Sequence, residues 1–167
     1  TNIGALISLE HLEKVESYIK LGVEEGGVIL TGGTREMTGP VTATNAGAFL
    51  RPTIIDGLDH TSRTSTEEIF GPVVTVHRFD SDDQAIEMAN STEYGLAGSI
   101  WSTDIERAHT LAQQIETGII WVNTWLHRDL RTPFGGVKNS GVGREGGNWS
   151  LGFFSEPLNV CIKHDQE

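Results

Sequence analysis

Cysteine is almost absent from this sequence: the 167 residues include one, Cys161. A disulfide within the chain is therefore excluded, and no Cys or His pair has the spacing of a zinc site. Chains that do without disulfides are typical of reducing compartments, so we expect a cytoplasmic protein.

Basic residues are also scarce, with 12 Lys and Arg against 23 Asp and Glu, which gives a formal net charge of -11. Nucleic acids and anionic membrane surfaces attract clustered positive charge, and no basic run is present, so neither is expected as a partner. No apolar run approaches the length that crosses a membrane. The first residues, Thr1 to Gly4, lack an initiator Met and a secretory signal pattern, so we expect a cut within a longer chain.

The apolar residues predict alternating helices and strands. Ser8 is placed to cap a helix whose apolar face carries Leu12, Val15, Ile19 and Val23, with Gly26-Gly27 as its end. A short buried strand is expected next, at 28–31. An irregular surface loop is predicted over 34–47.

Further along the chain the alternation continues. Pro52 predicts that the extended segment 49–55 is a sheet-edge strand or a covering segment. Capping boxes at Ser81 and Thr103 each open a helix, the second ending at Gly118. Strands are predicted at 73–79, 98–102 and 119–122. This order predicts an α/β fold with a mainly parallel sheet and flanking helices, and functional residues in the loop 123–131 that follows the last of these strands.

The segment Glu67–Pro72 reads Glu-Glu-Ile-Phe-Gly-Pro, with Gly and Pro forcing a turn. A carboxylate presented there can accept two hydrogen bonds from a vicinal diol such as a ribose, and the Phe70 ring can pack on a linked heterocycle. An alternative is that Ser65 to Glu68 is a capping box, although Gly71-Pro72 would end its helix within a turn.

A second segment, 133–145, is rich in glycine, and residues 141–146 match the dinucleotide fingerprint G-x-G-x-x-G. We reject that reading because the match follows a loop, and the 21 remaining residues cannot complete the βαβ unit that the fingerprint needs. A structural role is the better interpretation, with glycine letting backbone pass close to backbone.

Together, the segments 67–72 and 133–145 resemble the C-terminal part of the NAD(P)-dependent aldehyde dehydrogenase superfamily. The resemblance covers nearly the whole chain, from Asn2 to Lys163. It implies a partial α/β catalytic domain over 1–154. It also implies that residues 155–167 form an arm whose strand joins another subunit's sheet, so a homo-oligomer is expected.

In that superfamily a cysteine thiolate attacks the aldehyde, hydride passes to NAD(P)+, and the resulting thioester is hydrolysed. The resemblance implies that Glu68 binds the nicotinamide ribose of NAD and that Phe70 supports its ring. It places the nucleophile and the general base upstream of Thr1, so the chain alone is expected to be inactive. Cys161, between Val160 and Ile162, is expected to be a buried structural residue.

The pattern Trp-Leu-x-Arg-Asp-Leu at 125–130 resembles the branch that oxidises muconic semialdehydes, such as 2-hydroxymuconate or 2-aminomuconate 6-semialdehyde. A guanidinium in an apolar pocket favours a carboxylate, so Arg128 is the candidate for substrate binding, with Trp125 and Phe134 as pocket walls. Trp125 and Phe134 could instead be core residues, and Arg128 a surface residue paired with Asp129 or another acid.

Two other functions stay open on the sequence. One is an aldehyde dehydrogenase for uncharged aldehydes, in which Arg128 is solvated. The other is a non-catalytic module retained for oligomerisation through the terminal arm.

Overall fold

The computed structural model describes residues 3–35 and 47–164. The chain forms two compact units, Thr1–Thr92 and Glu93–Glu167. Most of the predicted loop at 34–47 lies outside the described residues. The domain boundary predicted at residue 154 stays a prediction.

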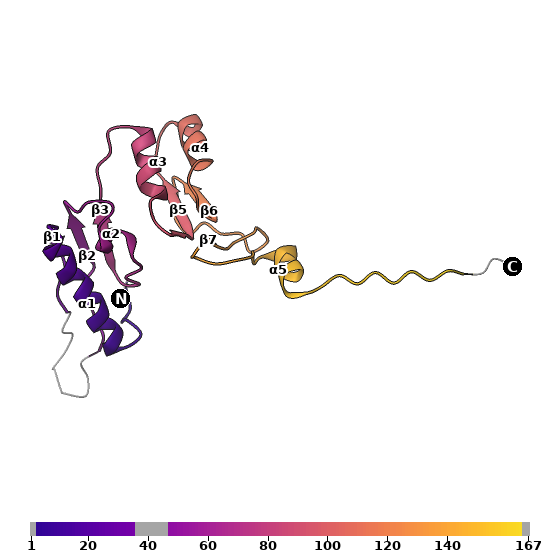
Figure 1. The fold of residues 1–167 in the computed structure, drawn as a ribbon, viewed down its shortest axis with the longest axis horizontal. Coiled ribbons are helices and arrows are strands. Elements are labelled where there is room, and N and C mark those ends of the chain that lie inside the picture. Colours follow the sequence, from indigo (N-terminus) through magenta and orange to yellow (C-terminus); the bar gives the residue numbers. More distant parts are fainter. Residues whose placement is uncertain (1–2, 36–46, 165–167) are drawn as a thin grey trace. The chain divides into compact units, whose positions relative to one another are not determined.

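The first unit is built on a three-stranded sheet with the order β1-β2-β3 (Figure 1). The β1–β2 pairing is antiparallel and the β2–β3 pairing is parallel. Its elements are α1 (Leu9–Glu24), β1 (Val28–Thr31), β2 (Thr53–Asp56), α2 (Arg63–Thr66), β3 (Val73–Val76) and α3 (Asp82–Asn90).

Helix α1 begins as predicted, with the Ser8 hydroxyl accepting a hydrogen bond from the backbone N–H of His11. Its buried positions are Leu12, Val15, Ile19 and Gly22, which follow one another at spacings of three and four residues. Val23 was predicted on this apolar face; its spacing from Ile19 agrees, but it lies in the last turn of α1 and is 51% exposed. Leu12, Val15 and Ile19 join Ala48, Leu50 and Ile69 in the core of this unit.

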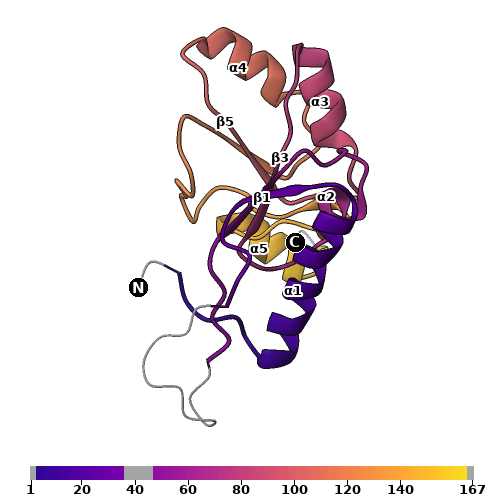
Figure 2. The same ribbon diagram turned by 90° about the vertical axis from the view of Figure 1, so that its left-hand side faces the viewer.

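The start of α2 lies beside the end of α1 (Figure 2). The Glu25 carboxylate, just past the end of α1, accepts hydrogen bonds from the backbone N–H groups of Arg63 and Thr64 at 3.0 and 3.1 Å. A carboxylate satisfies the free N–H groups of a helix N-terminus and is favoured there by the helix dipole. The two helices are thereby held together, and with them the segment that follows α2.

Two sequence predictions about the sheet were wrong. The strand β2 lies in its centre, with Thr53 and Ile55 buried, and Pro52 precedes the strand, where its missing N–H breaks no ladder bond. The predicted buried strand at 28–31 is β1, but Val28 and Leu30 are about 60% exposed. A run of apolar residues identifies a strand without showing which face of it is covered.

The second unit contains two strand pairs: β5 and β6 are parallel (Figure 1), and β4 and β7 are antiparallel. The second predicted cap is shifted by one residue, because the Asp104 side chain caps α4 and Thr103 does not. This helix ends at Ala112, so the end predicted at Gly118 was wrong. The elements of this unit are β4 (Tyr94–Gly95), β5 (Ala97–Ile100), α4 (Ile105–Ala112), β6 (Ile119–Val122), β7 (Val137–Lys138) and α5 (Gly147–Phe154).

The α/β class is confirmed, with most paired strand positions in parallel ladders. The chain after α5, as far as His164, is exposed and forms neither helix nor strand. Cys161 is exposed with it, so the prediction of a buried cysteine was wrong in this structure. Across residues 3–35 and 47–164, every helix is too short or too polar to cross a membrane.

Candidate functional site

The segment Glu67–Pro72 runs from the end of α2 to the start of β3. Ser65 lies in the last turn of α2, whose N-cap residue is Ser62, so the alternative in which Ser65 opens a helix is wrong. Glu67 follows as the C-cap in an extended conformation. The chain therefore leaves α2 as a connecting segment and does not continue as a helix.

Glu67 anchors this segment. Its carboxylate accepts hydrogen bonds from the Arg63 guanidinium at 2.6 and 3.0 Å and from the Tyr18 hydroxyl at 2.6 Å. Arg63 and then Tyr18 lower the pKa of Glu67 to about 2, and the same contact raises the pKa of Tyr18. Glu67 is thus a charged structural residue, held by Arg63 and Tyr18.

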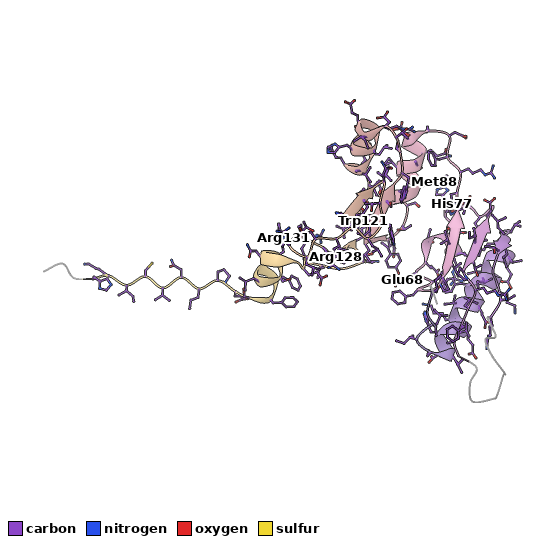
Figure 3. The ribbon with its side chains drawn as sticks, turned by 180° about the vertical axis from the view of Figure 1, so that it is seen from behind. Glu68, His77, Met88, Trp121, Arg128 and Arg131 are labelled. Atoms are coloured by element: carbon purple, nitrogen blue, oxygen red, sulfur yellow. The ribbon has the colours of Figure 1, made fainter. Side chains whose placement is uncertain are left out.

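Glu68 is exposed, and among the described residues its carboxylate has no hydrogen-bond partner (Figure 3). Its backbone carbonyl accepts a hydrogen bond from Lys14 Nζ at 3.3 Å. Phe70 is 74% exposed and has φ of 58°, a backbone conformation that is uncommon for a bulky residue. The Phe70 carbonyl accepts a hydrogen bond of 2.7 Å from His11 Nε2, and the two rings meet edge to face at 6.1 Å.

Between these exposed side chains the segment packs on α1. Ile69 is buried in the core. A Cβ atom added to Gly71 would lie 2.7 and 2.8 Å from the two Cγ atoms of Val15, so no larger residue fits without a shift. The alternation directs the Glu68 carboxylate and the Phe70 ring outward, and these two groups fit a diol linked to a flat heterocycle.

The sequence reading missed the residues of α1 that hold this segment. His11, Lys14 and Tyr18 are spaced by three and four residues and therefore share one face of the helix. The sequence shows this polar stripe on the helix. It does not show that the stripe contacts Glu67 and Glu68, more than 45 residues further along the chain.

Two tryptophans, Trp121 in β6 and Trp125 in the loop that follows, pack together. Trp121 lies in β6 as a core residue, only 6% exposed, and its Nε1 donates a hydrogen bond to the His127 carbonyl at 2.7 Å. Trp125 packs edge to face on Trp121, with ring centroids 5.1 Å apart, and is 59% exposed. These contacts fix the path of the loop up to the residue before Arg128.

Arg128 and Phe134 come together, as expected for two residues of one site. The Arg128 guanidinium carbon lies 4.1 Å from the centre of the Phe134 ring, and Arg128 Nη2 donates to the Glu145 carboxylate. Asp129 is not its partner, because that carboxylate binds Arg131 at 2.5–3.1 Å. Figure 3 labels both arginines. Trp125 packs on Trp121, and among the described residues its ring makes no aromatic contact with Phe134 or Arg128.

The glycine-rich segment holds Phe134 and Glu145, the two residues that contact Arg128, in place. Phe134 and Glu145 lie opposite each other, joined by two backbone hydrogen bonds of 2.8 Å. Gly146 has φ of 104°, and a Cβ atom there would lie 2.2 Å from the carbonyl oxygen of Thr132. The structural interpretation of these glycines is confirmed at this position. Phe134 and Glu145 also line a hollow of 310 Å³ within the second unit.

Metal ligation has no support in residues 3–35 and 47–164, where no three His, Cys, Asp or Glu side chains gather.

Comparison with known sequences gives consistent matches. Residues 1–160 match the aldehyde dehydrogenase family. The chain is 50% identical over 163 residues to the 2-hydroxymuconic semialdehyde dehydrogenase of Pseudomonas sp. (strain CF600), which covers 97% of this chain and 33% of that protein. It is 45% identical over 163 residues to the 2-aminomuconic semialdehyde dehydrogenase of Homo sapiens, covering 98% and 34%. The chain thus spans about a third of the length of these curated relatives.

Solved structures agree. The P. syringae indole-3-acetaldehyde dehydrogenase, solved with NAD+ and IAA, has a TM-score of 0.86 at 37% identity, covering 93% of this chain and 30% of that one. An aldehyde dehydrogenase from Bacillus cereus, solved with NAD+, has a TM-score of 0.82 at 38% identity, covering 90% and 29%. On the family match, the sequence identity and the shared fold, this chain belongs to the aldehyde dehydrogenase family.

Proposed function

We propose that the protein carrying this sequence oxidises a semialdehyde that bears a carboxylate, using NAD+ and water and giving a dicarboxylate and NADH. The observation that carries the substrate class is Arg128, held over the Phe134 ring in the loop after β6. A guanidinium stacked on a ring and only partly exposed binds a planar carboxylate well. Relatives named for muconic semialdehydes, which match nearly the whole chain, support the same class.

The residues of the first unit fit the cofactor. Glu68 offers a carboxylate with no partner among the described residues, which suits the two hydroxyls of a ribose, and the exposed Phe70 ring suits the face of a nicotinamide. NAD+ supplies the hydride acceptor. Glu68 and Phe70 would bind and orient it, while the nucleophile is expected in sequence outside this chain.

The test uses two aldehydes of equal length, 6-oxohexanoate and hexanal, which differ by a terminal carboxylate. NADH formation by the full-length protein should favour 6-oxohexanoate. Arg128→Ala should lower kcat/KM for 6-oxohexanoate about tenfold to a hundredfold, because a hydrogen bond to a charged group contributes about 1.5–3 kcal/mol. Arg131→Ala is the matched control, since Arg131 is 88% exposed and pairs with Asp129.

An aldehyde dehydrogenase for uncharged aldehydes is the second candidate, favoured by the ion pair that already engages Arg128. In that case Arg128→Ala would leave the preference between the two aldehydes unchanged.

The terminal arm is proposed to add a strand to another subunit's sheet. Leu158, Val160 and Ile162 are 69–86% exposed and alternate along the chain, as one face of a strand would require. Removal of residues 156–167 should reduce the mass measured by light scattering to that of a smaller assembly. An unchanged mass would contradict the proposal.

A further inference from the structure

Glu145 engages Arg128 through only part of the guanidinium. The described contact runs from Arg128 Nη2 to Glu145 Oε1. Among the described residues, no other hydrogen bond reaches this guanidinium. Since an arginine has five N–H donors in a planar fork, the Nε and Nη1 side is left for a second acceptor.

Phe134 restricts the plane of the Arg128 guanidinium, in addition to the contact that Glu145 makes with its edge. Phe134 lies under its face at 4.1 Å. Phe134 and Glu145 are themselves held opposite each other by two backbone hydrogen bonds, so the two groups that contact Arg128 move together. A long side chain is thereby restricted in two directions at once.

We propose that Glu145 is a positioning residue that sets the specificity of Arg128 for a carboxylate. It holds one nitrogen of the guanidinium, Phe134 supports the face, and the remaining N–H groups donate hydrogen bonds to the substrate's terminal carboxylate. This inference rests on the proposed function, because it deepens the role given to Arg128. Pre-orientation lowers the entropy that binding would otherwise cost for a side chain rich in rotamers.

The opposite effect is competition, in which the Glu145 carboxylate occupies the place of the substrate. The contact geometry favours positioning: a competitor would engage the fork with both oxygens, whereas a single nitrogen is bound here. The two readings predict opposite changes when the carboxylate of Glu145 is removed.

The measured quantity is the ratio of kcat/KM for 6-oxohexanoate to kcat/KM for hexanal, in the full-length protein. Effects on chemistry shared by both aldehydes cancel in this ratio. Glu145→Ala should lower it about twofold to tenfold, since ordering one such side chain costs about 0.5–1.5 kcal/mol. Glu145→Gln should restore most of the ratio, because the amide oxygen still accepts from Nη2. Glu116→Ala, which removes an acid paired with Lys138, is the control and should leave the ratio unchanged.

The outcomes separate the two proposals. If Arg128→Ala lowers the ratio and Glu145→Ala leaves it unchanged or raises it, Glu145 does not position Arg128, and the proposed substrate class stands. If Arg128→Ala leaves the ratio unchanged, the substrate class fails and the role of Glu145 fails with it. In the Arg128→Ala background, Glu145→Ala should have no further effect on the ratio, and an added loss would show that Glu145 acts by another route. A Glu145→Ala variant that does not fold leaves Glu145→Gln as the decisive measurement, and a ratio in that variant as low as in Arg128→Ala would overturn the proposal.

Discussion

Replacement of Gly71 by Ala should weaken both the fold and the cofactor site. The added Cβ would lie 2.7 and 2.8 Å from the methyl carbons of Val15, where an ordinary carbon contact needs about 3.5–4.0 Å. Val15 is fully buried on α1, and because protein interiors are close-packed it can move little. The backbone from Glu68 to Gly71 is therefore expected to shift away from α1.

Overpacking of a core costs about 1–3 kcal/mol. Gly71 has no positive φ, so alanine fits its backbone conformation. Alanine also lowers the conformational entropy of the unfolded chain, which stabilises the fold by about 0.4–1 kcal/mol and offsets part of this cost. The net destabilisation is about 1–2 kcal/mol, which should lower the Tm. Thermal unfolding followed by circular dichroism measures it. The KM for NAD+ should rise, because Phe70 adjoins the displaced residue.

The reasoning is refuted if Gly71→Ala leaves Tm and the KM for NAD+ unchanged. A double variant gives a sharper control. Val15→Ala removes both methyl groups that would clash, so in that background Gly71→Ala should be neutral or slightly stabilising, with a coupling energy of about 0.5–3 kcal/mol. Equal effects in both backgrounds would mean that the contact with Val15 is not the cause.

Three further outcomes are expected. Glu68→Gln should raise the KM for NAD+ about tenfold, because a neutral amide is a weaker acceptor for the ribose hydroxyls, and an unchanged KM would remove Glu68 from the cofactor site. The pKa of Glu67 is lowered from 4.5 to about 2, so its contacts contribute stability above about pH 4.5 that is lost as pH falls through 2. As the pH is lowered from 5 to 2, the Tm should thus fall more steeply for the wild type than for Glu67→Gln. The same pH dependence of Tm in both proteins would contradict this. Cys161→Ser should keep full turnover, and a loss of turnover in this variant would indicate that the Cys161 thiol is catalytic.

The sequence was most informative where a residue acts on its immediate neighbours. Ser8 and Ser81 cap their helices as predicted, because a capping bond spans three residues and can be seen in any short window. The cap of α4 was predicted at Thr103 and lies at Asp104, since these two adjacent residues are both suitable caps. Local chemistry thus located α1, α3 and α4 to within a residue at their starts, whereas α2 and α5 were not predicted.

Predictions that depended on distant segments were weaker. Pro52 marks the end of a strand as readily as the edge of a sheet, and only the pairing of β2 on both sides distinguishes them. The contact between Tyr18 and Glu67 joins residues 49 positions apart, and no pattern in either segment indicates it. For the same reason the sequence identified Arg128 and left its acidic partner open, although Glu145 lies in a segment that was already of interest.

The tryptophan pair of the second unit provides an optical reporter for the Arg128 loop. The indole N–H of Trp121 is bonded to the His127 carbonyl, one residue from Arg128, and the neighbouring ring of Trp125 is open to solvent. Indole emission responds to hydrogen bonding and to water, so a ligand that reorders this loop changes the fluorescence of the unlabelled protein. The loop that we assign to the substrate therefore carries its own signal for titration.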